Sequence, residues 1–313
     1  MSFINPDRFK IVDQLKRNHL VFPRAEELKT AFTKCLEYQF ISQKNDCVEA
    51  RGLVVTGNSR VGKSRELKKL IGDFNASKTQ MPDGRPAKIV SCVLSGRVSF
   101  KDLGVKTLSA LGYEVQRART QEYIWERVLD QAQGQGVVGI HYDECQHVFA
   151  AGAKSNAVFL DSFKSMMKEP RWPLMLILSG VPTLFEYVRS YEQLDALVDP
   201  VHFDEIRLKR DKDELRELLF AYADEAEIDI FQLVTMDFLS RLDFACAHRW
   251  GLVIELLIDT LTKAKLEGKS ELKLEDFAEQ FALRTGTTKQ YSPFTEPDYV
   301  EAFDAQRMLK LSE

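Results

Sequence analysis

A glycine-rich segment that ends in lysine and serine is the part of the sequence best suited to hold a phosphate chain. It fits the pattern G-x-x-x-x-G-K-[ST], and its candidate ligand-binding residues are Gly57, Asn58, Ser59, Arg60, Val61, Gly62, Lys63 and Ser64. The glycines let the backbone curl so that successive N–H groups face the phosphates. We expect Lys63 to reach the β- and γ-phosphates and the Ser64 hydroxyl to bind Mg²⁺.

Two acidic residues follow an apolar run farther along the chain. Val137–Tyr142 reads as a buried strand, and it ends in Asp143 and Glu144. A carboxylate at the end of a parallel strand lies at the ligand-binding edge of the sheet, beside the phosphate loop. We expect Asp143 to hold Mg²⁺ and Glu144 to activate water, because neutral water attacks phosphorus poorly. We interpret the flanking His141 and His147 as structural, since their spacing suits no single metal ion.

A polar strand end supplies a third candidate group. The run Leu174–Leu178 ends in Ser179 and Gly180. A hydroxyl at this place can hydrogen-bond the γ-phosphate or the lytic water, so Ser179 joins Glu144 and Lys63 as a candidate catalytic residue. The alternative is that Ser179 only begins a turn.

The elements that must position these groups are visible as apolar patterns. Short apolar runs separated by helical patterns indicate an α/β fold with a parallel sheet covered by helices on both faces; the runs are Leu53–Val55, Ile89–Leu94, Val137–Tyr142 and Leu174–Leu178. From about Ile206 only helical stripes remain. We therefore expect an N-terminal helical segment over 1–50, a nucleotide-binding core over 51–205, a helical lid over 206–285 and an irregular tail over 286–313.

Composition narrows the classes of protein. The chain has 313 residues, of which 44% are hydrophobic and 29% charged, as in globular proteins. No apolar run is long enough for a membrane helix, and the first residues lack the order of a signal peptide. Five scattered cysteines form no C-x-x-C pair, which indicates free thiols in a reducing compartment. These features predict a cytoplasmic protein that does not contact a membrane.

Charge is unevenly distributed along the chain. The net charge is −4, yet residues 51–130 hold 15 Lys and Arg against 8 Asp and Glu, a local excess of +7. An acidic total gives no general attraction to nucleic acid, but a basic stretch can form a local phosphate-binding face. Ordinary solvated helix faces are the alternative interpretation.

Together these motifs resemble those of AAA+ ATPases, and more narrowly the TniB/TnsC family of transposition regulators. The resemblance covers about residues 15–285. Besides the phosphate loop and the acidic pair, it is carried by the segments Val21–Arg24, Tyr142–Val148, Leu178–Leu184, Tyr191–Leu194 and Trp250–Leu257.

The resemblance implies a function. Members of this family bind ATP with Mg²⁺ between adjacent subunits and assemble as rings or helical filaments on double-stranded DNA. They connect a target-selection protein to a transposase, and ATP hydrolysis to ADP and phosphate breaks the assembly. By the same resemblance, Gly57, Gly62, Lys63 and Ser64 match phosphate and Mg²⁺ binding. Asp143 and Glu144 match metal binding and water activation, and Ser179 matches the polar sensor.

Two departures from the family pattern concern arginines. Relatives often carry an arginine before the last core strand that reaches the neighbouring subunit's γ-phosphate, but Asp195–Val201 has none. The nearest candidates are Arg189 and Arg207, and the departure predicts either slow hydrolysis without DNA or partners or an arginine that acts from another position. The second departure is the lid turn His248–Gly251, where relatives tend to be glycine-rich. Arg249 in this turn is a candidate for contact with the nucleotide phosphates, or else a solvated arginine at a helix start.

By analogy, contact with DNA comes from the loop after the second strand. This loop is Ser95–Lys101, within the basic stretch, and Arg97 and Lys101 are its candidates for backbone phosphate contacts. The alternative is that both are surface residues with no role in DNA binding.

Other functions share the nucleotide motifs. A replication initiator or helicase loader of the AAA+ class is one alternative, and a nucleotide-gated binding module with little turnover is another. A GTPase is disfavoured because the sequence lacks an N-K-x-D motif. A kinase is disfavoured because Glu144 beside Asp143 suits water activation, which a kinase must suppress.

Overall fold

The computed structural model describes residues 3–18, 20, 22–45, 48–116, 118–149 and 155–310. Val21, which contributed to the resemblance, and Cys47 lie outside these ranges. The chain forms two compact units, each with its own core: a sheet unit, Pro23–Phe203, and a helical unit that combines Met1–Phe22 with Asp204–Glu313. The expected N-terminal segment 1–50 is therefore shared between the units, and the sheet unit ends at residue 203.

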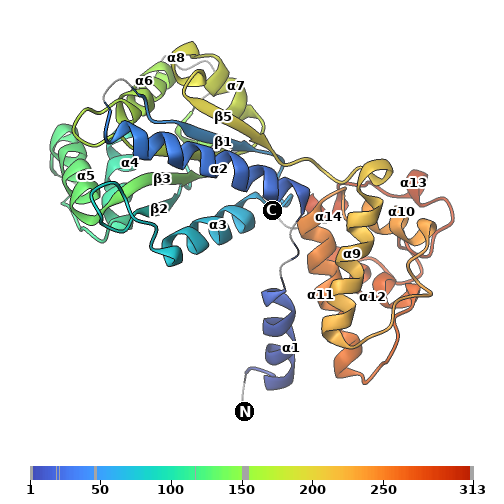
Figure 1. Ribbon diagram of the computed structural model, residues 1–313. Helices are drawn as coiled ribbons and strands as arrows, with labels where there is room; N and C mark the ends of the chain where they lie inside the picture. The colour runs from blue at the N-terminus through green and yellow to red at the C-terminus, as the bar shows by residue number, and fades with distance from the viewer. Residues whose placement is uncertain are drawn as a thin grey trace. The chain divides into compact units, whose positions relative to one another are not determined.

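A five-stranded parallel sheet forms the centre of the sheet unit (Figure 1). Its strands are β1 (Gly52–Thr56), β2 (Lys88–Val93), β3 (Val137–Asp143), β4 (Met175–Gly180) and β5 (Val198–His202), in the order β2-β3-β4-β1-β5. The four predicted strands are confirmed as β1 to β4. The fifth, β5, is an edge strand, where Pro200 is tolerated although it cannot donate a backbone hydrogen bond. Strands β1, β3 and β4 are buried along their whole length, as expected for a sheet covered on both faces.

Helices cover both faces of this sheet. The connection from β1 to β2 crosses the sheet in one direction, and the connections from β2 through β3 and β4 to β5 return in the other, so right-handed crossovers place their helices on opposite faces. Aromatic contacts agree with this division: Phe32 lies 5.7 Å from Phe74, and Phe100 lies 5.8 Å from Phe159. The helices are α2 (Pro23–Ser42), α3 (Lys63–Ser77), α4 (Phe100–Ala110), α5 (Gln121–Gln135), α6 (Ser155–Met167), α7 (Thr183–Arg189) and α8 (Glu192–Asp195), with a 3₁₀ turn, η1, at Cys145–Val148.

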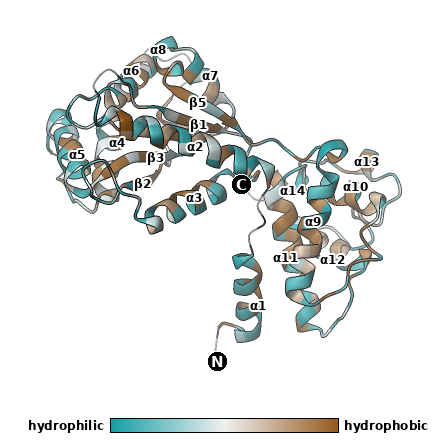
Figure 2. Ribbon diagram, in the orientation of Figure 1, coloured by the Kyte–Doolittle hydropathy of each residue, from teal (hydrophilic) through white to brown (hydrophobic). Residues whose placement is uncertain are grey.

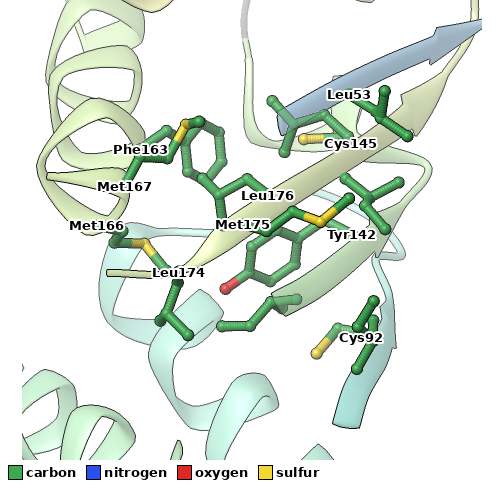
Figure 3. Close-up of a cluster of buried hydrophobic side chains, with 14 of the residues drawn as sticks. Leu53, Cys92, Tyr142, Cys145, Phe163, Met166, Met167, Leu174, Met175 and Leu176 are labelled. Atoms are coloured by element: carbon green, nitrogen blue, oxygen red, sulfur yellow. The ribbon is translucent and has the colours of Figure 1, made fainter. Parts of the chain in front are cut away.

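The core on the α6 side of the sheet is densely filled. Figure 3 shows Phe163 and Met167 of α6 beside Leu176 of β4, with Tyr142 of β3 below them. The Tyr142 hydroxyl is fully buried and lies 2.9 Å from the Thr107 hydroxyl, so its polar end is paired. Figure 2 shows the strands mainly in hydrophobic colours, whereas α2 and α3 carry both kinds of residue, as helices with one buried face do.

The helical unit has a separate aromatic core. Its helices are α1 (Pro6–Arg17), α9 (Leu208–Ala226), α10 (Met236–Ala245), α11 (Trp250–Leu266), α12 (Leu274–Thr285), α13 (Tyr299–Ala302) and α14 (Arg307–Lys310). The segment 286–310 belongs to this core, because Phe294 is buried and its ring lies 5.8 Å from Phe277 and 6.2 Å from Phe281. Arg241 fixes the segment by donating hydrogen bonds to the Pro293 and Glu296 carbonyls.

Across the described ranges we find no helix with the length and apolarity required to cross a membrane.

Candidate functional site

The phosphate loop connects β1 directly to the start of α3. Gly62 is the residue before the helix, and Lys63 and Ser64 lie in its first turn, where backbone N–H groups and the helix dipole favour an anion. A Cβ atom at Gly57 would lie 2.4 Å from the Phe203 carbonyl oxygen, so this position has room only for glycine. Arg60 adopts a left-handed conformation (φ 67°) that non-glycine residues rarely take, as expected for a tightly curled loop.

Lys63 is a buried cation held within the loop. Its side chain is largely enclosed, and Nζ donates to the carbonyl oxygens of Gly57 (2.7 Å) and Asn58 (2.9 Å). Burial of an ammonium group is costly unless hydrogen bonds compensate it, and these two carbonyls do so. The Ser64 side chain next to it is exposed. The loop thus combines a fixed cation, an accessible hydroxyl and a helix N-terminus, which are the groups that a triphosphate with Mg²⁺ requires.

Backbone pairing brings the loop to the ends of the neighbouring strands. Gly57 N donates to the Gly180 carbonyl at 3.3 Å, and β1 and β4 pair in register through Val55 and Ser179. On the other side of β4, Ser179 Oγ donates to Asp143 Oδ1 at 2.6 Å. The phosphate loop, Ser179 and the acidic pair therefore lie at one edge of the sheet, as the sequence predicts.

A buried histidine also lies at this edge. His141 Nε2 lies 2.8 Å from Ser179 Oγ, and its Nδ1 lies 3.2 Å from Ser91 Oγ on β2. Burial lowers the pKa of His141 to about 4, although the Asp143 carboxylate acts in the opposite direction. His141 is therefore neutral at pH 7. The sequence indicated a structural histidine, and its spacing gave no sign of the contact with Ser179.

Glu144 is held by its backbone and by a neighbouring amide. It adopts a left-handed conformation (φ 56°) and precedes η1. Gln146 Nε2 donates to the Glu144 carboxylate at 2.5 Å, and Gln146 Oε1 accepts a hydrogen bond from Val181 N at 3.3 Å. A Cβ at Gly180 would lie 2.2 Å from that amide oxygen, so the bridge requires glycine there. A non-glycine residue kept in this conformation at a strand end is typical of functional sites.

Arg24 adds a second cation beside the loop. One of its guanidinium nitrogens lies 3.9 Å from the position that a Cβ on Gly62 would occupy, and its guanidinium carbon lies 5.9 Å from the centre of the Phe203 ring. Glu66 of α3 lies in the same electrostatic environment: burial raises the pKa of its carboxyl group, and the positive charge of Arg24 opposes this. The sequence alone assigns no role to Arg24, although Arg24 ends the segment Val21–Arg24 that resembles the TniB/TnsC family.

The remaining predicted residues belong neither to the phosphate loop nor to the ends of β3 and β4. Arg97 is exposed in the loop before α4, and Lys101 is half-buried in the first turn of that helix. Arg189 is exposed at the end of α7, with its guanidinium carbon 5.5 Å from the centre of the Phe185 ring. In the helical unit, Arg207 is exposed, and Arg249 is buried with its guanidinium beside the Glu205 carboxylate.

Comparison with solved structures defines the class of fold. The chain is similar to Orc1 of Aeropyrum pernix, solved in complex with DNA, with a TM-score of 0.61 and 11% identity over 90% of this chain and 71% of that one. Cdc6p from Pyrobaculum aerophilum has a TM-score of 0.57 and 12% identity, over 86% of this chain and 69% of that one. A Walker-type ATPase of Pyrococcus abyssi has a TM-score of 0.53 and 16% identity, over 84% of this chain and 72% of that one. With the parallel sheet and the phosphate loop, these likenesses establish the AAA+ P-loop ATPase fold.

The family within this fold follows from the sequence. The family model described as "Bacterial TniB protein" matches residues 11–208, more than half of the chain. The chain belongs to the TniB family, which confirms the predicted resemblance. A comparison with curated proteins finds no match.

Proposed function

We propose that this protein is an ATP-dependent, DNA-binding AAA+ ATPase that assembles on duplex DNA and links target selection to a transposase. The nucleotide-binding part of this proposal rests on two hydrogen bonds that hold the phosphate loop beside the ends of β4 and β3. Gly57 N donates to the Gly180 carbonyl, and Ser179 Oγ donates to the Asp143 carboxylate. The transposition part rests on membership of the TniB family. The fold likeness to Orc1 in a complex with DNA supports DNA as a partner.

Each group has a defined task in this proposal. The loop N–H groups and Lys63 hold the triphosphate, and Ser64 and Asp143 hold Mg²⁺, which when bound neutralises charge on the phosphates. The residues present fit these ligands, because a buried ammonium, an exposed hydroxyl and a strand-end carboxylate lie at the same edge of the sheet. Glu144 accepts a proton from water as that water attacks the γ-phosphorus, which yields ADP and phosphate.

Arginines complete the proposed site from outside the loop. In the helical unit, Arg249 stays the candidate for contact with the nucleotide phosphates, and its guanidinium group is paired with the Glu205 carboxylate. Arg189 and Arg207 remain the candidates for reaching a neighbouring subunit's nucleotide, because Asp195–Val201 contains no arginine. An arginine that acts on the nucleotide of a neighbouring subunit contributes about 10³-fold or more to the rate. The isolated protein lacks that neighbour, so we expect it to hydrolyse ATP slowly.

Electron microscopy tests the proposed function directly. We expect purified protein with a non-hydrolysable ATP analogue, Mg²⁺ and duplex DNA to form rings or helical filaments, and to remain dispersed when the nucleotide is omitted. Assembly that is the same with and without nucleotide would contradict ATP control. Nucleotide binding without any assembly on DNA would instead favour an initiator or loader function, for which the fold likeness to Orc1 and Cdc6p provides the reason.

The shape of the phosphate loop gives a prediction with a matched control. Gly57→Ala places a methyl group 2.4 Å from the Phe203 carbonyl oxygen and must displace the loop, so affinity for a fluorescent ATP analogue should fall at least about 10-fold. Gly72→Ala, on the same α3, meets no atom within 4 Å and should leave affinity unchanged. Equal affinities for both variants would show that the loop does not hold the nucleotide.

The proposed DNA contacts give a second prediction. Replacing Arg97 and Lys101 together with alanine should weaken binding to duplex DNA of any sequence and reduce the slope of log affinity against log salt by about 2, one for each phosphate contact. Replacing Lys209 and Lys212, two exposed lysines of α9, removes the same charge and should leave that slope unchanged. Fluorescence anisotropy with the ATP analogue present measures both. An unchanged slope in the first variant would assign DNA binding to other residues.

A further inference from the structure

We propose that His141 is a positioning residue that acts through Ser179 to fix the Asp143 carboxylate for the metal ion. The inference rests on the proposed function, since it takes Asp143 as the group that holds Mg²⁺. In this proposal Ser179 orients the carboxylate of Asp143, and His141 in turn orients Ser179.

The contacts span three adjacent strands of the sheet. Ser91 of β2 and His141 of β3 are register partners, and their side chains meet at 3.2 Å. His141 and Asp143 lie two residues apart on β3 and so project from the same face. Ser179 at the end of β4 contacts both, at 2.8 Å and 2.6 Å. His141, Asp143 and Ser179 are all buried, so water is a poor competitor for the hydrogen bonds among these three residues, whereas Ser91 is exposed.

The direction of each hydrogen bond follows from the number of protons available. Ser179 has one hydroxyl hydrogen, and it goes to the Asp143 carboxylate, which can only accept when ionised. The Ser179 oxygen must therefore accept from His141 Nε2–H. On the other side of the ring, His141 Nδ1 lies 3.2 Å from the Ser91 hydroxyl. Each member of the series thus fixes the orientation of the next.

This arrangement leaves one oxygen of Asp143 to face the metal. Oδ1 accepts from both Ser179 Oγ (2.6 Å) and the Glu144 backbone N–H (3.1 Å). Oδ2 is therefore the oxygen that is presented to a cation or to its bound water. Because its only hydrogen is committed to Asp143, Ser179 cannot donate to the γ-phosphate at the same time. Hydrogen bonds that orient a metal-holding carboxylate commonly change metal affinity by about 10- to 100-fold when removed.

Two amide variants of His141 separate positioning from packing. The amide nitrogen of glutamine can occupy the place of Nε2 and donate to Ser179, whereas the shorter asparagine places its amide near Nδ1 and loses that contact. We expect His141→Asn to weaken Mn²⁺ binding to the protein–nucleotide complex by about 10- to 100-fold, measured by electron paramagnetic resonance. His141→Gln should stay within a few-fold of the unmodified protein. Affinity for the fluorescent ATP analogue in EDTA should be equal in all three.

The outcomes distinguish this inference from the proposed function. If His141→Asn binds Mn²⁺ like the unmodified protein, or if both amide variants lose the same affinity, the positioning role is wrong. Ser179→Ala, a small change that breaks the same connection, should reproduce the loss even if neither His141 variant folds, and unchanged Mn²⁺ affinity in Ser179→Ala also overturns the inference. Failure of the unmodified protein to bind nucleotide with Mn²⁺ would instead contradict the proposed function.

Discussion

Lys63→Ala is expected to weaken ATP binding by about 100-fold and to abolish nucleotide-dependent assembly on DNA. Lys63 is the buried cation of the phosphate loop, and two backbone carbonyls fix its ammonium group. Loss of a hydrogen bond to a charged group costs roughly 1.5–3 kcal/mol, or about 10- to 100-fold in affinity, and Lys63 is assigned to two phosphates. Equilibrium titration with a fluorescent ATP analogue measures the affinity, and electron microscopy with DNA measures assembly.

The control for this variant lies on the same helix. Lys68→Ala removes an exposed lysine of α3 and should leave affinity and assembly unchanged. We expect thermal unfolding to show that Lys63→Ala remains folded. The variant removes the hydrogen-bond donor of the Gly57 and Asn58 carbonyls, and these lie in the phosphate loop at the edge of the sheet. A folded Lys63→Ala protein that binds ATP normally would overturn the assignment of the phosphate loop.

Glu144→Gln should have the opposite pattern, with assembly retained and hydrolysis lost. Glutamine keeps the size of the side chain and still offers an oxygen to Gln146 Nε2, but it cannot accept a proton from water. General-base catalysis typically contributes about 10²- to 10⁴-fold, so phosphate release should fall by that factor in the presence of DNA. Affinity for the ATP analogue should be unchanged.

The matched control for the base is an exposed glutamate on a neighbouring helix. Glu186→Gln on α7 makes the same chemical change and should hydrolyse ATP at the unmodified rate. Normal phosphate release by Glu144→Gln would refute the base assignment. Loss of both hydrolysis and nucleotide binding would indicate that Glu144 supports the loop instead.

The sequence predicted correctly those strands that appear as continuous runs of apolar residues. Strands β1 to β4 were visible because parallel strands buried on both faces become continuous apolar runs. Strand β5 lacks this signal, because Asp199 and Pro200 interrupt it; Asp199 instead accepts hydrogen bonds from Lys34 and Arg51. Local periodicity also does not say which core a helix joins. Helix α1 contributes Leu15 to the core of the helical unit, whereas α2 contributes Phe32 to that of the sheet unit.

In the candidate site, too, some residues could be predicted from local sequence and others could not. The phosphate loop and the pair Asp143 and Glu144 depend on short continuous motifs, so the sequence indicates them directly. The contacts of His141 and Gln146 depend on which strands are neighbours and on their register, and no local pattern carries that information. A neutral residue such as Gln146 also has no distinctive spacing, although a Cβ at position 180 would collide with its amide oxygen.

Binding of ATP by the unmodified protein in magnesium buffer is the most direct test of the central claim, that the curled loop and Lys63 hold a triphosphate at the edge of the sheet. Isothermal titration calorimetry with a non-hydrolysable analogue should show saturable binding with one nucleotide for each chain, and affinity should fall when Mg²⁺ is removed. A folded protein that shows no binding heat at any workable concentration, and no displacement of a fluorescent ATP analogue, would contradict the account.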